Sequence, residues 1–423
     1  MSILAWDRPR GRRLADTAAQ QSAAPAVLTP LRMTLVGALL IAVGPLSISL
    51  YTPAMTMLIA ALHTSESGVR ATITVYLFGF ATAQLLCGPL SDRLGRRPVL
   101  LACLALYVIG SAICAGSSSI GMLIGGRLVQ GMGACGGVAL SRVMVVDRFA
   151  GNGAARIISL MSLILSVAPA AAPILGGALI TVTTWRALFA ILAVYGAVLL
   201  ALVWWFPETN LHRDARATRL RSIVVNYATL LTSRGFVSQV VLTALSIGGF
   251  YASQTLAPFV LMGKLGLSSP VFGCVTATLM VSYLLGSLAT NRLLRYVTMT
   301  RLVLCGALMV LSAAIALTLS ITFLGIGIVQ IIAPMCVWML GFAFIMPGVT
   351  TAALALFPRN AGSASALMGS LQMGMGFAGT ALCSLFADAT QAIAVVPPAM
   401  GALAVIAYLA ANWRSFRTAR PDR

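Results

Sequence analysis

Residues 88–98 read GPLSDRLGRRP, and this stretch is crowded with charge in a chain of which 9% is charged. Its charged residues are Asp92, Arg93, Arg96 and Arg97. The apolar run TVYLFGFATAQLLC precedes the stretch, and the apolar run VLLACLALYVIG follows at once. A short basic loop between two long apolar runs is typical of the turn that joins two membrane spans.

The composition extends this interpretation to the whole chain. Hydrophobic residues make up 59% of the 423, more than a soluble fold of this length can bury. A helical span needs about 20 mostly apolar residues to cross about 30 Å of hydrocarbon. We therefore expect an all-α integral membrane protein with twelve transmembrane helices. The expected spans are 33–54, 71–90, 99–116, 121–146, 157–180, 187–206, 237–259, 271–290, 302–321, 325–349, 361–386 and 396–413.

The placement of charge predicts how these spans are oriented. Most of the 28 basic residues fall in segments that lie inside if both termini are cytoplasmic. Arg70, Arg186 and Lys264 fall outside, and Arg127 and Arg142 fall within a span. This asymmetry follows the positive-inside rule. Because the basic residues are dispersed among short loops, the net charge of +19 does not indicate nucleic-acid binding. The near absence of lysine indicates a GC-rich bacterial genome, and hence the bacterial inner membrane.

The chain divides into two halves of similar length. We expect a disordered basic tail at 1–31, six-helix halves at 32–206 and 237–413, a cytoplasmic linker without a core of its own at 207–236, and a second tail at 414–423. A faint echo of the opening stretch, GSLATNRLLRYVTMTR, follows the second span of the second half. Paired six-span halves are a known transporter design.

With GPLSDRLGRRP the chain resembles the major facilitator superfamily, in which this stretch is the loop between spans two and three. Further motifs resemble the drug:proton antiporters of its bicyclomycin/chloramphenicol-resistance (Bcr/CflA) branch. These motifs are GRLVQGMGA (126–134), APAAAPILGG (168–177), WRALFAI (185–191), FPET (206–209) and RNAGSASALMGSLQ (359–372). The resemblance implies two pseudo-symmetric six-helix halves and export of small amphipathic drugs.

The opening loop is the first candidate site. Gly88 permits close helix approach, and Asp92 can accept hydrogen bonds from the free amides that begin span eleven. The resemblance implies that partnership, and a second one between the loop arginines and Asp147. Such a cluster would latch the two halves together on the cytoplasmic side; the alternative is a solvated topology anchor. The latch candidates are Gly88, Asp92, Arg93, Gly95, Arg96, Arg97 and Asp147.

Two spans carry further candidates. Arg127 lies inside span four, where a charge costs several kcal/mol unless it is paired or hydrated. Gln130 follows it on the same face. In span five, Pro169, Pro173, Gly176 and Gly177 predict a kinked, smooth helix, and the resemblance ties this motif to exporters. The alternatives are a structural arginine and a packing kink.

Span one departs from the related antiporters, which usually carry an acid in a stretch like IDMYLPA. This chain reads ISLYTPA, with Ser49 at the acidic position and Tyr51 after it. Asp388 and the Asp92/Asp147 pair are then the remaining coupling candidates. An unpaired Arg127 in the cavity would favour neutral or anionic substrates.

By analogy with the family, spans one, four, seven and ten line a central cavity. The lining candidates are Tyr51, Tyr251, Gln254, Trp338, Phe342 and Met346, although each alone fits a packing role as well. The eight cysteines lie singly, without a CxxC pair, so we expect packing roles and no metal.

Together these features predict a secondary transporter that exports small amphipathic drugs or toxic compounds by proton antiport with alternating access. The alternative within transport is a metabolite exporter or facilitator with weakened or different ion coupling. We expect a monomer that is not an enzyme and needs no cofactor, with the proton gradient as driving force. No phosphate-binding GxxxxGK[ST] loop is present, and a membrane enzyme or a sensor would need a catalytic constellation or an output domain that the chain does not show.

Overall fold

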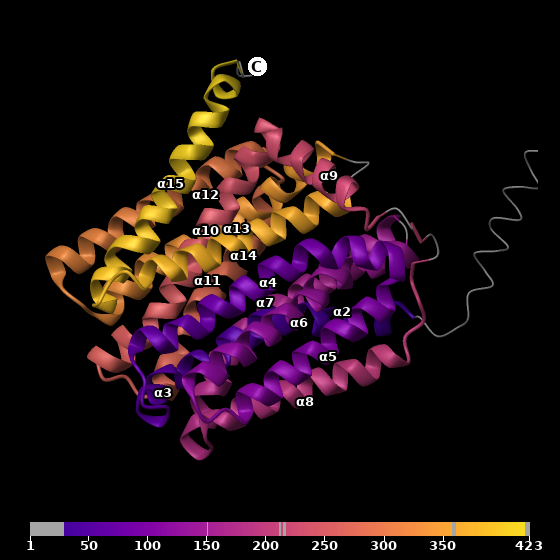
Figure 1. The fold of residues 1–423 in the computed structure, drawn as a ribbon. Coiled ribbons are helices and arrows are strands. Elements are labelled where there is room, and N and C mark those ends of the chain that lie inside the picture. Colours follow the sequence, from indigo (N-terminus) through magenta and orange to yellow (C-terminus); the bar gives the residue numbers. More distant parts are fainter. Residues whose placement is uncertain (1–28, 150, 211–212, 215–216, 358–360, 419–423) are drawn as a thin grey trace, which may run out of the picture.

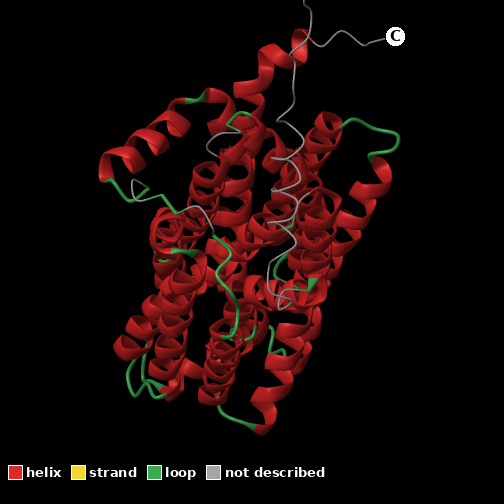
Figure 2. Ribbon diagram, turned by 90° about the vertical axis from the view of Figure 1, so that its right-hand side faces the viewer, coloured by secondary structure: helices red, strands yellow, loops and turns green. Residues whose placement is uncertain are grey.

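The computed structural model describes residues 29–149, 151–210, 213–214, 217–357 and 361–418, and these form a bundle of long helices without a strand (Figures 1 and 2). The predicted N-terminal tail and the last five residues lie almost wholly outside that part of the chain. Of the described helices, ten are long and apolar enough to span a membrane. Helices α7 and α14 occupy the positions of predicted spans five and eleven, so the twelve-helix fold is confirmed.

The first half runs through α2 (Pro30–Ser49), η1 (Thr52–Ala54), α3 (Met55–Ala61), α4 (Glu66–Leu94), α5 (Arg96–Ala115), α6 (Ile120–Arg148), α7 (Gly151–Val182) and α8 (Trp185–Trp204). The second half follows the linker helix α9 (Leu220–Thr232). It runs through α10 (Arg234–Ala257), η2 (Pro258–Lys264), α11 (Ser269–Leu293), α12 (Met299–Leu319), η3 (Ser320–Leu324), α13 (Ile328–Ala355), α14 (Ala361–Cys383) and α15 (Ala389–Thr418).

The two halves lie side by side in Figure 1, the first in indigo to magenta and the second in orange to yellow. They meet along two helix pairs, in which α14 packs on α4 and α11 packs on α7. Residues 88–98, predicted as a loop, form the end of α4, the single residue Gly95 and the start of α5; we keep the name loop 88–98 for them. We call the end of the bundle that carries this segment and α9 the arginine-rich end. The other end, which carries α3, is the opposite end.

The first span is longer than predicted and is broken. Helix α2 ends at Ser49, a short 3₁₀ turn follows, and α3 continues the span to Ala61. Pro53 explains the break, because proline has no N–H to donate and its ring clashes with the carbonyl four residues earlier, that of Ser49. The Thr52 hydroxyl donates to that same carbonyl at 3.1 Å. The ISLYTPA stretch therefore forms a bend in the span.

The linker differs from its prediction, because it contains an amphipathic helix that packs on both halves. The Tyr227 hydroxyl donates to the Leu85 carbonyl of α4 at 2.8 Å. Leu230 is buried in a small cluster with Phe236, Val240 and other residues of the second half. The apolar residues of LRSIVVNYATLLT recur at helical spacing, which gives α9 a face to bury.

Candidate gating, seam and coupling sites

At the arginine-rich end, loop 88–98 is held by a charged cluster that we define as Asp92, Arg96, Asp147 and Glu208. The Arg96 guanidinium forms an ion pair with Asp92 through Nη1, and its Nε donates to Asp147 Oδ2 at 3.1 Å. The Arg96 side chain is 11% exposed, so these bonds are partly shielded from water. The predicted pairing of a loop arginine with Asp147 is thus present in the structure.

Glu208, from the FPET motif, is the cluster member that the sequence did not single out. Its carboxylate accepts hydrogen bonds from the backbone N–H groups of Arg96 at 2.9 Å and Arg97 at 3.2 Å. It therefore caps the free amides at the start of α5, where negative charge is favoured. Gly95 makes this cap possible, because its φ of 109° suits glycine and a Cβ there would overlap the Glu208 carboxylate.

The other loop residues bind the linker, α8 and α14. Arg93 donates to the Thr218 hydroxyl at 2.7 Å. Arg97 donates to the Trp204 carbonyl and lies over the Trp204 ring at 5.8 Å from its centre. Gly88 faces the second half, where a Cβ on it would lie 3.7 Å from the Ala366 Cβ.

The cluster therefore joins elements of the first half to the linker. The Asp92 carboxylate bonds to Arg96, and its predicted partnership with the start of α14 stays a prediction. Residues 358–360, which precede α14, lie outside the described residues. Between the halves, Gly88 lies against Ala366 near this end, and the Ser370 hydroxyl donates to the Ala81 carbonyl at 2.8 Å near the middle of α4.

Arg127 lies in a closed aromatic cage inside the first half. Its side chain is fully buried, and its guanidinium carbon lies 4.4 Å from the Tyr76 ring centre, 4.9 Å from that of Tyr51 and 5.8 Å from that of Phe189. Its Nη1 donates to the Ser47 carbonyl at 3.0 Å. Ring faces and a carbonyl thus take the place of the missing carboxylate. Among the described residues Arg127 forms no ion pair, as expected, but its side chain is enclosed by these groups.

Gln130 extends the cage into a polar network across α2, α5 and α6. It accepts from Arg127 at 2.7 Å and donates to the Ser111 hydroxyl at 2.9 Å. The Ser47 and Tyr107 hydroxyls share a hydrogen bond of 2.7 Å. Hydrogen bonds thus link three helices around the cage, while Nε and Nη2 of Arg127 are buried among the rings without a hydrogen-bond partner in the described part of the chain.

The proline–glycine motif of α7 lies at the opposite end, where two glycines serve two different contacts. A Cβ at Gly176 would overlap the Leu50 carbonyl of the first span. A Cβ at Gly177 would overlap the Ser269 carbonyl of α11, in the second half. Gly273 of α11 packs in the same way on the Pro173 carbonyl. Pro169 and Pro173 lie inside the helix, so the motif forms a seam of backbone contacts between the halves.

Arg70 is a second tie at the opposite end, and the sequence placed it in an outer loop. It lies in the first turns of α4 and is 2% exposed. Its guanidinium donates to the Cys383 carbonyl of α14 at 3.1 Å and lies 5.9 Å from the Phe259 ring centre of η2. Oε2 of Glu66, four residues earlier, lies 3.8 Å from Nη2 of Arg70. Arg70 thus links the first half to two elements of the second.

The proposed lining residues have different surroundings. Trp338 is fully buried between Gly249 of α10 and Gly401 of α15, so it packs inside the second half and does not line a cavity. Phe342 packs on Tyr283 of α11 at 6.2 Å between ring centres.

Further lining and coupling candidates are placed as follows. Tyr251 is half-buried, and Gln254 and Ser49 are buried. The Met346 sulfur lies 3.9 Å from the Gln372 side-chain nitrogen.

Residues 37–380 match the Major Facilitator Superfamily. The chain belongs to that superfamily. It is 28% identical over 387 residues to the multidrug resistance protein D of Escherichia coli, covering 90% of this chain and 96% of that protein. It is 26% identical over 384 residues to the bicyclomycin resistance protein homolog of Haemophilus influenzae, covering 88% and 94%. The predicted resemblance to this resistance branch is confirmed.

Among solved structures, a D-xylose–proton symporter aligns with a TM-score of 0.69 and 16% identity, over 89% of this chain and 97% of that one. This likeness shows the fold. Members of the superfamily move small molecules across membranes, so the chain is a multi-pass membrane transporter and not an enzyme.

Asp388, one of the coupling candidates, is held in place by Lys264. It lies in the loop before α15 and forms an ion pair with Lys264, and it accepts from the Thr390 N–H at 3.0 Å. The hydrogen bond from Lys264 lowers the pKa of the Asp388 carboxyl below its usual value. A lowered pKa means that the paired, ionised form persists at neutral pH and is lost only under strongly acidic conditions.

Replacing Asp388 by asparagine is therefore expected to leave the pH dependence of transport unchanged between about pH 5 and pH 8. The Lys264 contact will weaken, with an effect on stability below about 1 kcal/mol because the pair is exposed. Transport rates across that pH range, in wild type and Asp388→Asn, test this. A flattened pH profile in the variant would show that Asp388 carries the coupling proton.

Proposed function

We propose that this transporter exports small amphipathic drugs or toxic compounds across the bacterial inner membrane in exchange for protons. The observation that carries the proposal is its similarity, over about nine-tenths of the chain, to proteins named for multidrug and bicyclomycin resistance. Both termini and the arginine-rich end are cytoplasmic in this proposal, as the distribution of basic residues predicts. The protein works as a monomer, without a cofactor.

The contacts at the two ends of the bundle support alternating access. At the opposite end, the α7–α11 seam and Arg70 bring the halves together through close backbone contacts and a buried cation. At the arginine-rich end, the charged cluster binds the first half to the linker. A rocking motion would open the seam and rearrange the arginine-rich end in turn.

A panel assay identifies the substrate class. Purified protein in liposomes is supplied with neutral, anionic and cationic amphipathic compounds, and their movement is recorded. The proposal predicts saturable transport of at least one amphipathic class, and protein-free liposomes provide the control. Transport of small polar metabolites alone would contradict the drug assignment.

We assign proton coupling to the charged cluster, because Asp388 is held by Lys264 and Ser49 replaces the usual acid. Asp92 and Asp147 share one guanidinium, that of Arg96. Protonation of either carboxylate removes one of the two charge-assisted bonds that fix the loop. Loss of the bond to Asp147, whose side chain is 21% exposed, alters the free energy of the loop by about 1.5–3 kcal/mol, enough to bias a two-state equilibrium by at least about tenfold. Loss of the bond to the more exposed Asp92 has a smaller effect because water screens it.

Replacing Asp147 by asparagine is expected to reduce pH-driven transport by at least about tenfold while substrate exchange without a gradient continues. The neutral amide keeps the shape of the side chain and cannot take up a proton. Both rates are measured in the same liposomes, with Asp388→Asn, in the loop before α15, as the control. Equal losses in driven transport and in exchange would contradict a coupling role and point to a structural one.

Ser49 favours a second candidate function within transport. Without an acid in the first span, the protein could move a metabolite with weakened or different ion coupling. Substrate movement that follows its own concentration gradient and ignores an imposed pH gradient would support this second function.

A further inference from the structure

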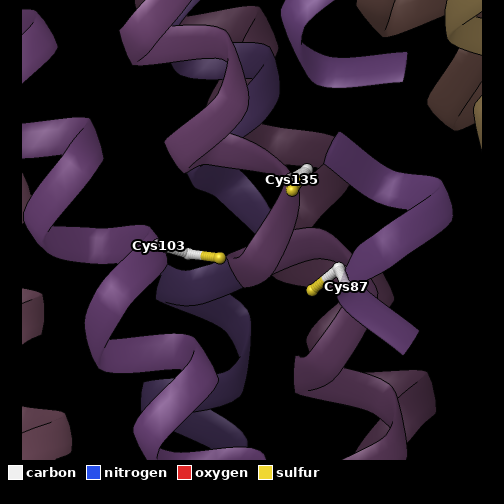
Figure 3. A group of neighbouring side chains, drawn as sticks. All are labelled: Cys87, Cys103 and Cys135. Atoms are coloured by element: carbon white, nitrogen blue, oxygen red, sulfur yellow. The ribbon is translucent and has the colours of Figure 1, made fainter. Parts of the chain in front are cut away.

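Three cysteines that lie far apart in the sequence converge in the first half. Cys87 of α4, Cys103 of α5 and Cys135 of α6 place their sulfur atoms within 4.8 Å of one another. Figure 3 shows the three thiols pointing toward one another from their separate helices. Cys87 and Cys135 are buried, and Cys103 is half-buried. The sequence predicted separate packing roles, because no two of these residues are close along the chain.

The packing of α5 on α6 holds Cys103 in this place. Gly136 of α6 faces Cys103, and a Cβ there would lie 2.8 Å from its sulfur. Gly133, one turn away, gives the same close approach to the Tyr107 backbone. The absence of side chains at these two positions lets the Cys103 thiol enter the space between the helices.

We propose that these three thiols form a binding site for a soft monovalent metal ion, Cu(I). The sulfur spacing fits the ion. Three metal–thiolate bonds of about 2.3 Å in one plane would place the sulfurs about 4.0 Å apart, so small side-chain adjustments close the site.

The donor set selects the kind of metal. Within the described residues, the group contains sulfur ligands only, without a histidine or carboxylate. Thiolates select soft ions such as Cu(I), whereas structural zinc requires a fourth ligand in a tetrahedral arrangement. Binding exchanges S–H bonds for Cu–S bonds and releases the thiol protons to the medium, with no change of oxidation state. The affinity is therefore expected to fall as the pH is lowered.

The site lies where a metal ion from the cytoplasm could stabilise the first half. Cys87 immediately precedes the loop that begins at Gly88, so the site lies toward the arginine-rich end, which faces the reducing cytoplasm in the proposed orientation. A bound ion would cross-link α4, α5 and α6 and so stabilise the first half.

Anaerobic titration of the purified full-length protein with Cu(I), against a chromophoric Cu(I) chelator, tests the site. One Cu(I) per protein is expected, with three sulfur ligands in X-ray absorption and a higher melting temperature. Cys103→Ser should weaken binding by at least about 100-fold, because loss of outer-shell partners alone costs about 10- to 100-fold. Cys114→Ser, on the same helix, is the matched control and should bind as wild type.

A second variant tests the site even if Cys103→Ser fails to fold. Replacing the five remaining cysteines (Cys114, Cys274, Cys305, Cys336 and Cys383) should preserve the stoichiometry of one and the three-sulfur signal. Absence of tight Cu(I) binding in the wild type, or binding that survives Cys103→Ser with wild-type affinity, would overturn the proposal. So would a spectrum with fewer than three sulfur ligands.

Discussion

Arg127→Ala is expected to abolish transport and to destabilise the first half by about 2–5 kcal/mol. The substitution removes a charge-assisted bond to the Ser47 carbonyl and leaves the Gln130 side-chain oxygen without its donor. Each buried group left unsatisfied costs about 1–3 kcal/mol, and the contacts with three aromatic rings are lost as well. Transport into liposomes and the melting temperature in detergent measure the two effects.

Arg127→Lys separates charge from shape in this experiment. Lysine keeps the positive charge but cannot place a planar guanidinium among the Tyr51, Tyr76 and Phe189 rings. It should therefore recover only part of the stability. The exposed Arg221→Ala serves as the control. Wild-type transport and melting temperature in Arg127→Ala would show that the cage has no role.

Gly177→Leu is expected to hold the seam between the halves open and to reduce transport to the background rate. Even a Cβ at this position overlaps the Ser269 carbonyl, and a backbone atom of a packed helix cannot move aside at small cost. The halves must separate at this end to accommodate the new side chain. Closure of the seam, which alternating access requires, then fails.

Spin labels at the exposed residues Val182 of α7 and Val271 of α11 can measure the seam directly. We expect a longer interlabel distance in Gly177→Leu than in the parent. Gly176→Leu should instead disturb contact with Leu50 inside the first half and leave this distance unchanged. A Cβ at Gly125 would meet no atom within 4 Å, so Gly125→Leu is a neutral control. An unchanged distance in Gly177→Leu would contradict the role of the seam.

Much of the fold could be predicted because span length and charge placement are local properties of the sequence. The bend after Ser49 and the linker helix were harder to foresee. In the sequence Pro53 lies within an apolar run and does not mark a break. The many arginines around α9 make its segment look polar, although the helix has an apolar face. The bend depends on one proline and the helix on the spacing of its apolar residues, and the average composition of a segment shows neither.

Site residues could be predicted from the sequence only where a recognisable motif contains them. The pairing of loop 88–98 with Asp147 came from the motif, but Glu208 did not, because a cap depends on where a distant carboxylate lies in space. The cage around Arg127 joins α2, α4 and α8, so no spacing in the sequence reveals it. The burial of an arginine did indicate that partners must exist, and Tyr76, whose ring lies nearest, could have been sought on that ground.

The most direct test of proton-coupled export is transport in liposomes under an imposed pH gradient, with the internal pH recorded. We predict that a proton gradient drives substrate uphill and that a substrate gradient alone moves protons in the opposite direction. Substrate movement that neither responds to the pH gradient nor changes the internal pH would contradict antiport.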